Sequence, residues 1–457
     1  MQLQGWRSFY VSAFCSGPLS ARLQFCISRK EARMAAKEYP RLKLDRSMQM
    51  YTEAKEICPG GIMGIRRPYN FVEGEFPIFL ERGYAGHIID VDGNDYIDML
   101  CAYGPIILGY NEPEITRAVY SQLEKGFCFS LVQPIQNELE RRLVSLIPCA
   151  EQAILVKTGS DATSLAVRIA RGYTDRKYIL RCGYHGWHDW CVEVQGGVPE
   201  EISSLTIEFE YGKLDDLEEK LAAHKGEVAG VIITPVGHPN AKPVMAPPQG
   251  YLEAVKELVH AYGAVLIFDE VRTGFRVSMG GAQERYGVTP DLGTFGKALA
   301  NGYAISAVVG KREVMQVAEK KVFVSSTFFP NSLEMVAAMK CLDILEREKV
   351  PDSLWKRGTQ FLVRLRQIAE RSGMPVTVSG IPPMPYMTFN PHPADKEKTY
   401  RARREYFYTQ TIRRGLFIQP YHHWYIAHRH TDADLEKALT AIEEALELTA
   451  RRFPIGS

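Results

Sequence analysis

The sequence has almost no net charge. Lys and Arg total 55 and Asp and Glu total 54, which gives a formal charge of +1 over 457 residues. Nucleic acids and acidic membrane surfaces are bound by strongly basic proteins, so this balance argues against both as partners. The sequence also lacks any apolar run of the roughly 20 residues that a membrane-spanning helix needs. These absences leave a globular protein of ordinary composition, with small molecules as the expected partners.

Cysteine is scarce and scattered. The nine cysteines are odd in number, and none belongs to a Cys-x-x-Cys pair or to a cluster with histidine. A disulfide framework or a zinc site would need such spacing. We therefore expect reduced thiols, no bound metal and a cytoplasmic location.

Acidic residues are absent from the first thirty positions. The first acid is Glu31, and four basic residues and five serines precede it. An organellar transit peptide has this composition. The alternative is an unstructured extension with an over-long start, because Met34 opens a more ordinary stretch. We favour the extension, since the apolar residues show no amphipathic period. Residues 1–45 are therefore assigned to a disordered N-terminal extension outside the fold.

Between about residue 151 and residue 310, short apolar runs alternate with amphipathic helices. Nearly continuous apolar strands separated by helices indicate a mostly parallel sheet that is covered on both faces. The sequence thus predicts an α/β protein whose large domain spans residues 106–344. The apolar runs are residues 153–158, 177–182, 228–235, 264–270, 292–297 and 304–310.

The segments on either side differ from this pattern. A β-hairpin is predicted around the turn Asp92-Gly93, which lies between two apolar runs. The last segment ends in a helix capped at Thr431, with apolar residues at helical spacing. We expect residues 46–105 and 345–457, from both ends of the chain, to form one small domain.

Ligands of open α/β sheets bind at the carboxyl ends of the strands, and three strand ends carry unusual residues. The first reads Lys157-Thr158-Gly159-Ser160. We expect a turn at Gly159 and a helix that starts at Ser160. Glycine lets a ligand approach the backbone, and the free N–H groups of a helix N-terminus bind phosphate. A plain helix cap at Ser160 is the alternative.

The second strand end carries two acids, Asp269 and Glu270, directly after five apolar residues. A carboxylate in such a place is costly unless it meets a cation. The ring nitrogen of pyridoxal-5′-phosphate (PLP), when protonated, is a cation of that kind. The alternative is a helix cap or a pair of acids in a surface loop.

The third strand end holds Lys297 between Gly296 and Ala298, in a turn between two apolar strands. A lysine in a site of low dielectric loses proton affinity and becomes an amine nucleophile. Simple solvation in a loop is the alternative. None of the three strand ends decides the matter alone, but together they indicate a PLP enzyme.

Two motifs extend this indication. The motif DEVRTGFR precedes FGKALANG by about twenty residues, and Tyr184-His185 follows the second strand. On these motifs the chain resembles the class III PLP-dependent aminotransferases of fold type I, especially the branch with glutamate-1-semialdehyde 2,1-aminomutase. The resemblance extends from about Tyr51 to Leu446. It implies the fold-type-I transferase architecture, a large domain plus a small domain, and a homodimer with shared active sites.

The resemblance implies a role for each matching residue. Lys297 would carry PLP as a Schiff base and then move a proton. Asp269 would pair with the ring nitrogen, and Tyr184 would stack on the ring. These three are the candidate catalytic residues. The candidate cofactor-binding residues are Gly159, Ser160, Tyr184, His185, Asp269, Val271, Arg272, Lys297 and Thr327.

Four of these residues surround the cofactor in similar enzymes. By this resemblance Gly159 and Ser160 would hold the phosphate at a helix N-terminus, and Val271 would pack on the ring face opposite Tyr184. Thr327 matches a threonine that reaches the phosphate of the neighbouring subunit. The active site would then be complete only in a dimer.

The chain departs from the family pattern on its substrate side. Arg272 stands where many members have a small or neutral residue, and Thr234-Pro235 replaces a Glu-Pro pair. Near the C-terminus, the region around His422 lacks the glutamate of the aminomutase. These changes favour an aminotransferase that moves an amino group from an amine or amino acid to a carbonyl acceptor. An aminomutase of the glutamate-1-semialdehyde type, or an amino-acid racemase, is the alternative.

Substrate binding is assigned to three residues. Arg66 and Arg67 follow a Pro-Gly-Gly turn, in a segment that lies over the active site in similar enzymes. The planar guanidinium group is well shaped for a carboxylate, so both arginines and His422 are candidate substrate-binding residues. Arginines that merely solvate a loop are the alternative. We expect a substrate with a carboxylate or another anionic group.

Overall fold

The computed structural model describes residues 36–64, 67–237 and 244–456 of the chain. From Glu38 onward they form one compact unit. Residues 1–35 of the predicted extension lie outside the described residues, and so does Arg66. The last part of the predicted extension belongs to the fold, because Leu44 is buried and Arg41 donates to the Gly74 carbonyl at 2.6 Å. None of the helices in these ranges combines the length and the apolar character that a bilayer span requires.

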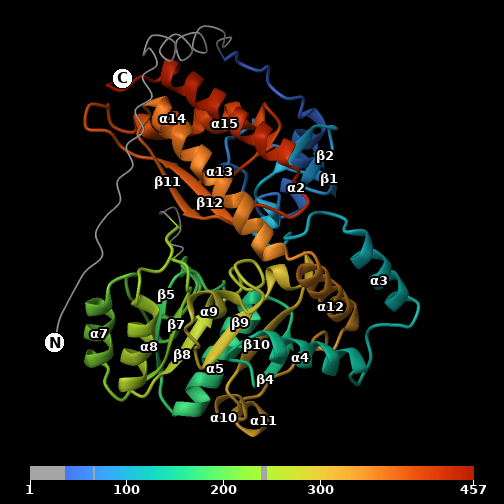
Figure 1. Ribbon diagram of the computed structural model, residues 1–457, viewed down its shortest axis with the longest axis vertical. Helices are drawn as coiled ribbons and strands as arrows, with labels where there is room; N and C mark the ends of the chain where they lie inside the picture. The colour runs from blue at the N-terminus through green and yellow to red at the C-terminus, as the bar shows by residue number, and fades with distance from the viewer. Residues whose placement is uncertain (1–35, 65–66, 238–243, 457) are drawn as a thin grey trace, which may run out of the picture. The chain divides into compact units, whose positions relative to one another are not determined.

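The central element is a seven-stranded sheet in the order β4-β10-β9-β8-β7-β5-β6 (Figure 1). Its strands are β4 (Gln152–Val156), β5 (Tyr178–Cys182), β6 (Thr206–Glu208), β7 (Val228–Ile233), β8 (Val265–Asp269), β9 (Leu292–Phe295) and β10 (Ser306–Gly310). β10 is antiparallel to both of its neighbours, β4 and β9, and the other pairs of neighbouring strands in this sheet are parallel. The connection from β9 to β10 is too short for the crossover that parallel strands require. The predicted mostly parallel sheet is confirmed.

Helices cover both faces of this sheet. Successive strand residues point to opposite faces, so Ile267 packs in the core on the side of α5 (Gly159–Thr174), and Phe268 packs in the core on the other side. That second core also contains α7 (Leu214–Ala223) and α8 (Tyr251–Ala261). Two covered faces explain why the strands read as continuous apolar runs.

The two ends of the chain meet in a second, smaller sheet. Its order is β1-β2-β3-β13, and β13 (Leu416–Phe417) is parallel to β3 (Asp95–Asp98). The hairpin of β2 (His87–Asp90) with β3 confirms the predicted turn, where Gly93 has a φ of 88°. The remaining strand is β1 (Leu80–Tyr84). The two chain ends thus share one sheet, as predicted, while the division into a large and a small domain stays a prediction.

The C-terminal segment is more regular than its sequence indicates. A long helix, α13 (Val350–Ser372), leads into the hairpin of β11 (Val376–Ile381) and β12 (Met384–Phe389). Then follow α14 (Thr399–Ile412) and α15 (Asp432–Arg452), drawn in orange and red in Figure 1. Thr431 caps α15 as predicted. The other helices are α2 (Asp45–Ile57), α3 (Pro113–Leu123), α4 (Pro134–Leu146), α6 (Glu200–Ser203), α9 (Gly281–Tyr286), α10 (Arg312–Met315), α11 (Val317–Lys320) and α12 (Ser332–Arg347).

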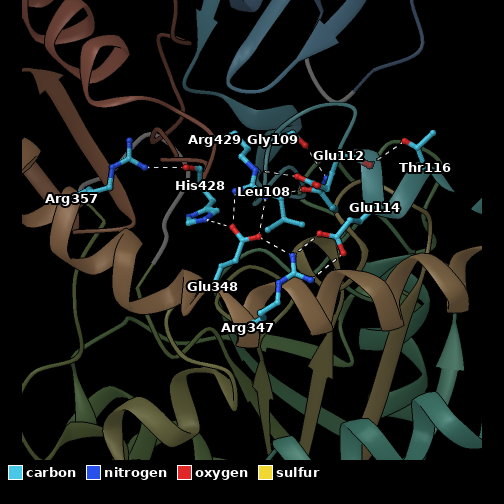
Figure 2. A network of polar contacts seen from close by, with 11 residues as sticks. Leu108, Gly109, Glu112, Glu114, Thr116, Arg347, Glu348, Arg357, His428 and Arg429 are labelled. Carbon is cyan, nitrogen blue, oxygen red and sulfur yellow. Dashed lines mark hydrogen bonds and ion pairs between the residues drawn. The ribbon is translucent and has the colours of Figure 1, made fainter. Parts of the chain in front are cut away.

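A polar network ties the C-terminal segment to the helices next to it (Figure 2). Its centre is Glu348, directly after α12. The carboxylate of Glu348 accepts hydrogen bonds from Arg429 at 2.6 and 3.2 Å and from Arg347 at 3.0 Å. Arg429 also donates to Glu112, just before α3, at 3.1 Å. The network holds the chain around residue 429 against the large domain.

Candidate active site

A cavity of about 290 Å³ opens at the carboxyl ends of the central strands. The residues that line it follow β4, β5, β7, β8 and β9, which is the place where open α/β sheets bind ligands. Among the candidate residues, those that line the cavity are Gly159, Ser160, Tyr184, His185, Asp269, Val271, Arg272 and Lys297. The structure therefore brings together all three candidate catalytic residues.

Asp269 is the last residue of β8 and is 5% exposed. Its Oδ2 lies 2.8 Å from Nδ1 of His185, and its Oδ1 accepts hydrogen bonds from the Thr294 hydroxyl at 3.2 Å and the Val271 amide at 3.1 Å. Burial is the largest single influence and raises the pKa of the Asp269 carboxyl. The hydrogen bond and charge of His185, the Val271 amide and the charge of Lys297 together outweigh burial, so the pKa of Asp269 lies below its usual value. Asp269 is thus a buried carboxylate that can hold a cation.

Lys297 begins a 3₁₀ turn, Lys297–Ala300, directly after β9. Its φ of 44° is unusual for a residue other than glycine, and such strain is typical of functional positions. Burial lowers the pKa of Lys297 to about 8, and the positive charge of Arg272 acts in the same direction. A neutral amine, which is the nucleophilic form, is therefore accessible near physiological pH.

The N-terminus of α5 forms one end of the cavity. The helix begins at Gly159 and is capped by Thr158, whose hydroxyl accepts from the Asp161 amide at 3.1 Å. The prediction that the helix starts at Ser160 was therefore wrong by one residue, because Thr158 and Asp161 form a capping box. The first N–H groups of a helix have no partner inside it, so those of Gly159 and Ser160 can bind an anion.

Glycine at position 159 follows from the packing. A Cβ atom there would lie 2.8 Å from Cγ1 of Val271, which is closer than real Cβ contacts. Val271 therefore lies directly beside the helix N-terminus. Gly159 and Val271 thus line the cavity side by side, next to the N–H groups that can bind an anion.

Arg67, His422 and Thr327 are not among the described residues that line this cavity. Arg67 donates to the carbonyl oxygens of Pro59 at 3.0 Å and Ile62 at 2.5 Å, so its guanidinium group closes its own loop. Arg66 lies outside the described residues. Thr327 is exposed on a surface segment of the same chain.

His422 is buried rather than open to a ligand. Its ring stacks on His423 with centroids 4.3 Å apart and meets Tyr103 edge-on at 5.2 Å. His423 in turn contacts the ring of Tyr425 at 4.6 Å. Aromatic packing therefore surrounds this side chain, and its direct contact with a substrate stays a prediction.

Several residues in or near the cavity wall have no predicted role. Lys157 and the segment Tyr303–Ser306 line the cavity. Arg276 donates to the carbonyl oxygens of Gly104 at 2.9 Å and Ile426 at 3.1 Å, and so joins three distant segments beneath the site. The signal for Lys157 was present, since it follows the apolar residues of a strand, but a lysine at a strand end is common on protein surfaces.

The residues of the cavity fit PLP. The cofactor has an anionic phosphate, a flat ring, a basic ring nitrogen and an aldehyde. The cavity offers the N-terminus of α5, the side chains of Tyr184 and Val271, the carboxylate of Asp269 and the amine of Lys297. Each chemical feature of the cofactor thus has a counterpart in the wall.

Comparison with known proteins agrees with this fit. The model of the class III aminotransferase family matches residues 69–446. The 3-aminobutyryl-CoA aminotransferase of Cloacimonas acidaminovorans is 57% identical over 407 residues, which cover 89% of this chain and 98% of that protein. The glutamate-1-semialdehyde 2,1-aminomutase of Methanocella arvoryzae is 34% identical over 428 residues, which cover 89% and 99%.

Solved structures of transaminases have the same fold. The FumI protein of Sphingopyxis sp. MTA144, in its PLP internal aldimine form, has a TM-score of 0.84 and 29% identity over 89% of this chain and 97% of that one. An omega-transaminase from Sphaerobacter thermophilus has a TM-score of 0.81 and 26% identity, over 89% and 98%. The predicted fold, cofactor and aminotransferase activity are confirmed, and the aminomutase alternative is the less supported one. The chain belongs to the class III aminotransferase family and is a PLP-dependent aminotransferase.

Proposed function

We propose that this aminotransferase removes the amino group from the third carbon of a 3-aminoacyl thioester and passes it to a carbonyl acceptor. The support for the substrate is the 57% identity to a protein named 3-aminobutyryl-CoA aminotransferase, along 98% of the length of that relative. The support for the chemistry is one observation in the cavity. Lys297, with a pKa of about 8, lines the same cavity as the buried carboxylate of Asp269.

In this proposal each side chain has a defined task. PLP, when bound, withdraws electrons from the carbon that carries the amino group. Lys297, as a neutral amine, takes the proton from that carbon and then returns a proton to the cofactor. Asp269 keeps the ring nitrogen protonated, and His185 keeps Asp269 ionised and fixed in direction. Tyr184 and Val271 hold the ring between them.

Arg272 is our candidate for the substrate's acyl oxygen. It lines the cavity and forms no ion pair in the part of the chain that the structure describes, and its Nε is buried without a hydrogen-bond partner. The charge of Asp269 acts on Arg272 without forming an ion pair, and a buried N–H such as Nε is costly unless a ligand supplies an acceptor oxygen. The carbonyl oxygen of a 3-aminoacyl group, two carbons from the amine, is such a ligand atom.

We also propose a homodimer. Two surface segments, residues 127–132 and 323–330, lie close together. The amide of Ser332, two residues after the second segment, donates to the Phe127 carbonyl at 3.0 Å. Their large apolar side chains are unusually exposed, with Leu131 at 81% and Phe323 at 77%. An exposed apolar patch of this kind marks an interface, and a second copy of the chain would cover it and receive Thr327.

A cytoplasmic location also stays a proposal. Its support is that the described cysteines form no disulfide, as expected in a reducing compartment.

A half-reaction tests the proposed function. The PLP-loaded enzyme is mixed with a 3-aminobutyryl thioester in the absence of an acceptor, and the absorbance of the lysine-bound cofactor is followed. We expect this absorbance to disappear as about one equivalent of 3-oxobutyryl thioester is released per site. Glutamate 1-semialdehyde serves as the comparison substrate. Release of no free oxo product, or a preference for the semialdehyde, contradicts the proposal.

The role of Arg272 is tested with two substrates. Arg272→Met should raise KM for the 3-aminobutyryl thioester roughly tenfold, the size of one hydrogen bond to a charged group. It should leave the KM for sec-butylamine, which has no acyl oxygen, almost unchanged. Equal effects on both substrates contradict the role given to Arg272.

A further inference from the structure

Lys157 is a cation of the cavity that the proposed reaction leaves without a task. It lies between β4 and α5, and its side chain is 14% exposed. Its Nζ lies 3.1 Å from Oε2 of Glu334, which is 18% exposed and belongs to the first turn of α12. The two residues join the cavity to the helix that follows the surface segment of Thr327.

The contact between the two charges is incomplete. Although Nζ and Oε2 are within ion-pair distance, neither atom has a hydrogen-bond partner of acceptable geometry in the described part of the chain. An ammonium group has three N–H donors, and buried donors without acceptors are costly. Glu334 therefore fixes the position of Lys157 while leaving its donors for a further acceptor.

The cavity wall beside Lys157, at the N-terminus of α5, carries less positive charge than a phosphate group needs for neutralisation. The residues next to Lys157 along the cavity are Thr158, Gly159 and Ser160, at the N-terminus of α5. Asp161 adds a carboxylate to the same helix turn, where it accepts from the Thr158 amide at 2.8 Å. The helix N-terminus supplies only about half a positive charge, whereas a phosphate monoester carries about −1.5 to −2 at neutral pH.

The other cations of the cavity are committed elsewhere. Among the described residues that line it, the lysines and arginines are Lys157, Arg272 and Lys297. The charge of Arg272 acts directly on Lys297, so these two residues lie together. Lys157 is therefore the cation available to the phosphate at the α5 end.

We propose that Lys157 is a further cofactor-binding residue, whose ammonium group contacts the phosphate of PLP. Glu334 positions this ammonium group and competes with the phosphate for its charge. The inference rests on the proposed function, which uses bound PLP, and on the fit of the PLP phosphate to the N-terminus of α5. It adds a side-chain charge to a site otherwise built from backbone N–H groups and hydroxyls.

Cofactor affinity tests the inference without use of turnover. The full-length enzyme is freed of cofactor, and the Kd values of PLP and of pyridoxal, which lacks the phosphate, are measured by fluorescence titration. Lys157→Met should weaken PLP binding about tenfold, or about 1.4 kcal/mol, and leave pyridoxal unchanged. Lys157→Arg should retain PLP affinity within about threefold, since it keeps the charge.

Glu334→Gln separates a cofactor contact from a purely structural ion pair. If Lys157 serves the phosphate, removal of the competing carboxylate should tighten PLP binding about two- to fivefold, the opposite direction to Lys157→Met. If the pair is only structural, both variants lower the melting temperature and neither changes the ratio of the PLP and pyridoxal Kd values. That result overturns the inference.

Ser160→Ala shows which proposal has failed. If it weakens the binding of PLP and not of pyridoxal while Lys157→Met has no effect, the phosphate lies at α5 and the inference about Lys157 is wrong. If neither variant changes the affinity for PLP, neither side chain contacts the phosphate and the inference about Lys157 falls. The half-reaction with the 3-aminobutyryl thioester then tests the proposed function separately.

Discussion

The Nδ1–H group of His185 donates a hydrogen bond to Oδ2 of Asp269 across 2.8 Å, and both side chains are buried. The two residues are 84 positions apart and follow different strands, β5 and β8. Because a carboxylate only accepts hydrogen bonds, this contact fixes which nitrogen of His185 carries the proton. The pair forms a rigid negative site at the bottom of the cavity.

Asp269→Asn should slow proton removal from the substrate by about 10³-fold or more, corresponding to about 4 kcal/mol. A neutral amide cannot keep the ring nitrogen protonated. The measurement is the single-turnover rate of the half-reaction, with circular dichroism to verify the fold. Asp291→Asn is the control, because Asp291 pairs with Lys311 and His260 outside the cavity lining and should affect stability only. A change below about threefold for Asp269→Asn would mean that this acid does not face the ring nitrogen.

His185→Phe should move the acidic limb of the pH–rate profile to higher pH. The hydrogen bond from His185 holds the pKa of Asp269 down against the effect of burial, so its loss raises this pKa. Asp269 would then become protonated, and inactive, at a higher pH than in the parent enzyme. His185→Gln, which can still donate a hydrogen bond, should shift the limb less. Profiles of kcat/KM from pH 5 to 9 that coincide for all three enzymes contradict this role of His185.

The capture of PLP by the cofactor-free enzyme should accelerate as the pH rises, with a midpoint near 8. Lys297 has a pKa of about 8, lowered by burial and by Arg272, and only its neutral form attacks the aldehyde. In Arg272→Met the neighbouring positive charge is gone, so the pKa of Lys297 rises and the midpoint moves upward. Stopped-flow absorbance measures the rate against pH. A midpoint that stays in place, or moves downward, would rule out the electrostatic influence of Arg272.

Glu348→Gln should lower the free energy of unfolding by about 1 to 3 kcal/mol at pH 7. Hydrogen bonds from Arg429 lower the pKa of Glu348 to about 2. A carboxyl whose pKa is lower in the folded state stabilises the fold above its unfolded pKa of 4.5, and this contribution is lost as the pH falls toward 2. The difference between parent and variant should therefore shrink below pH 4.5.

Urea unfolding of both proteins at pH 7 and pH 4 measures this difference. Glu346→Gln is the matched control, because Glu346 lies two residues earlier and pairs with Arg142 while 56% exposed. Such an exposed pair contributes little, so the control should change the free energy by less than about 1 kcal/mol. If the two variants behave alike, the network of Figure 2 adds no more stability than an ordinary surface ion pair.

The features that could be predicted are those that local sequence encodes. Apolar runs between helices predicted the central sheet, and the turn at Asp92-Gly93 predicted a hairpin that the structure has. Asp269 and Lys297 could be singled out because a charged residue at the end of an apolar strand is visible without any partner. Their convergence on one cavity followed from a general rule, since parallel strands end at the same edge of a sheet.

What the sequence could not predict is which distant side chain each polar group contacts. Arg67 has the right chemistry for a substrate carboxylate, yet the carbonyls of its own loop take up its donors. His422 has the right chemistry for a substrate contact, yet its ring packs against Tyr103 and His423. In both cases the residue type was compatible with two partners, and chain geometry selected one of them.

The sequence by itself determined the fold class, the family and the strand ends that carry the chemistry. Burial periodicity and turn preferences act over a few residues, so they can be read along the chain. Only the tertiary structure decided that His185 holds Asp269 and that Lys157 meets Glu334. A hydrogen bond or an ion pair requires two atoms within about 3 Å, and segments far apart in sequence reach that distance only after the whole core has packed.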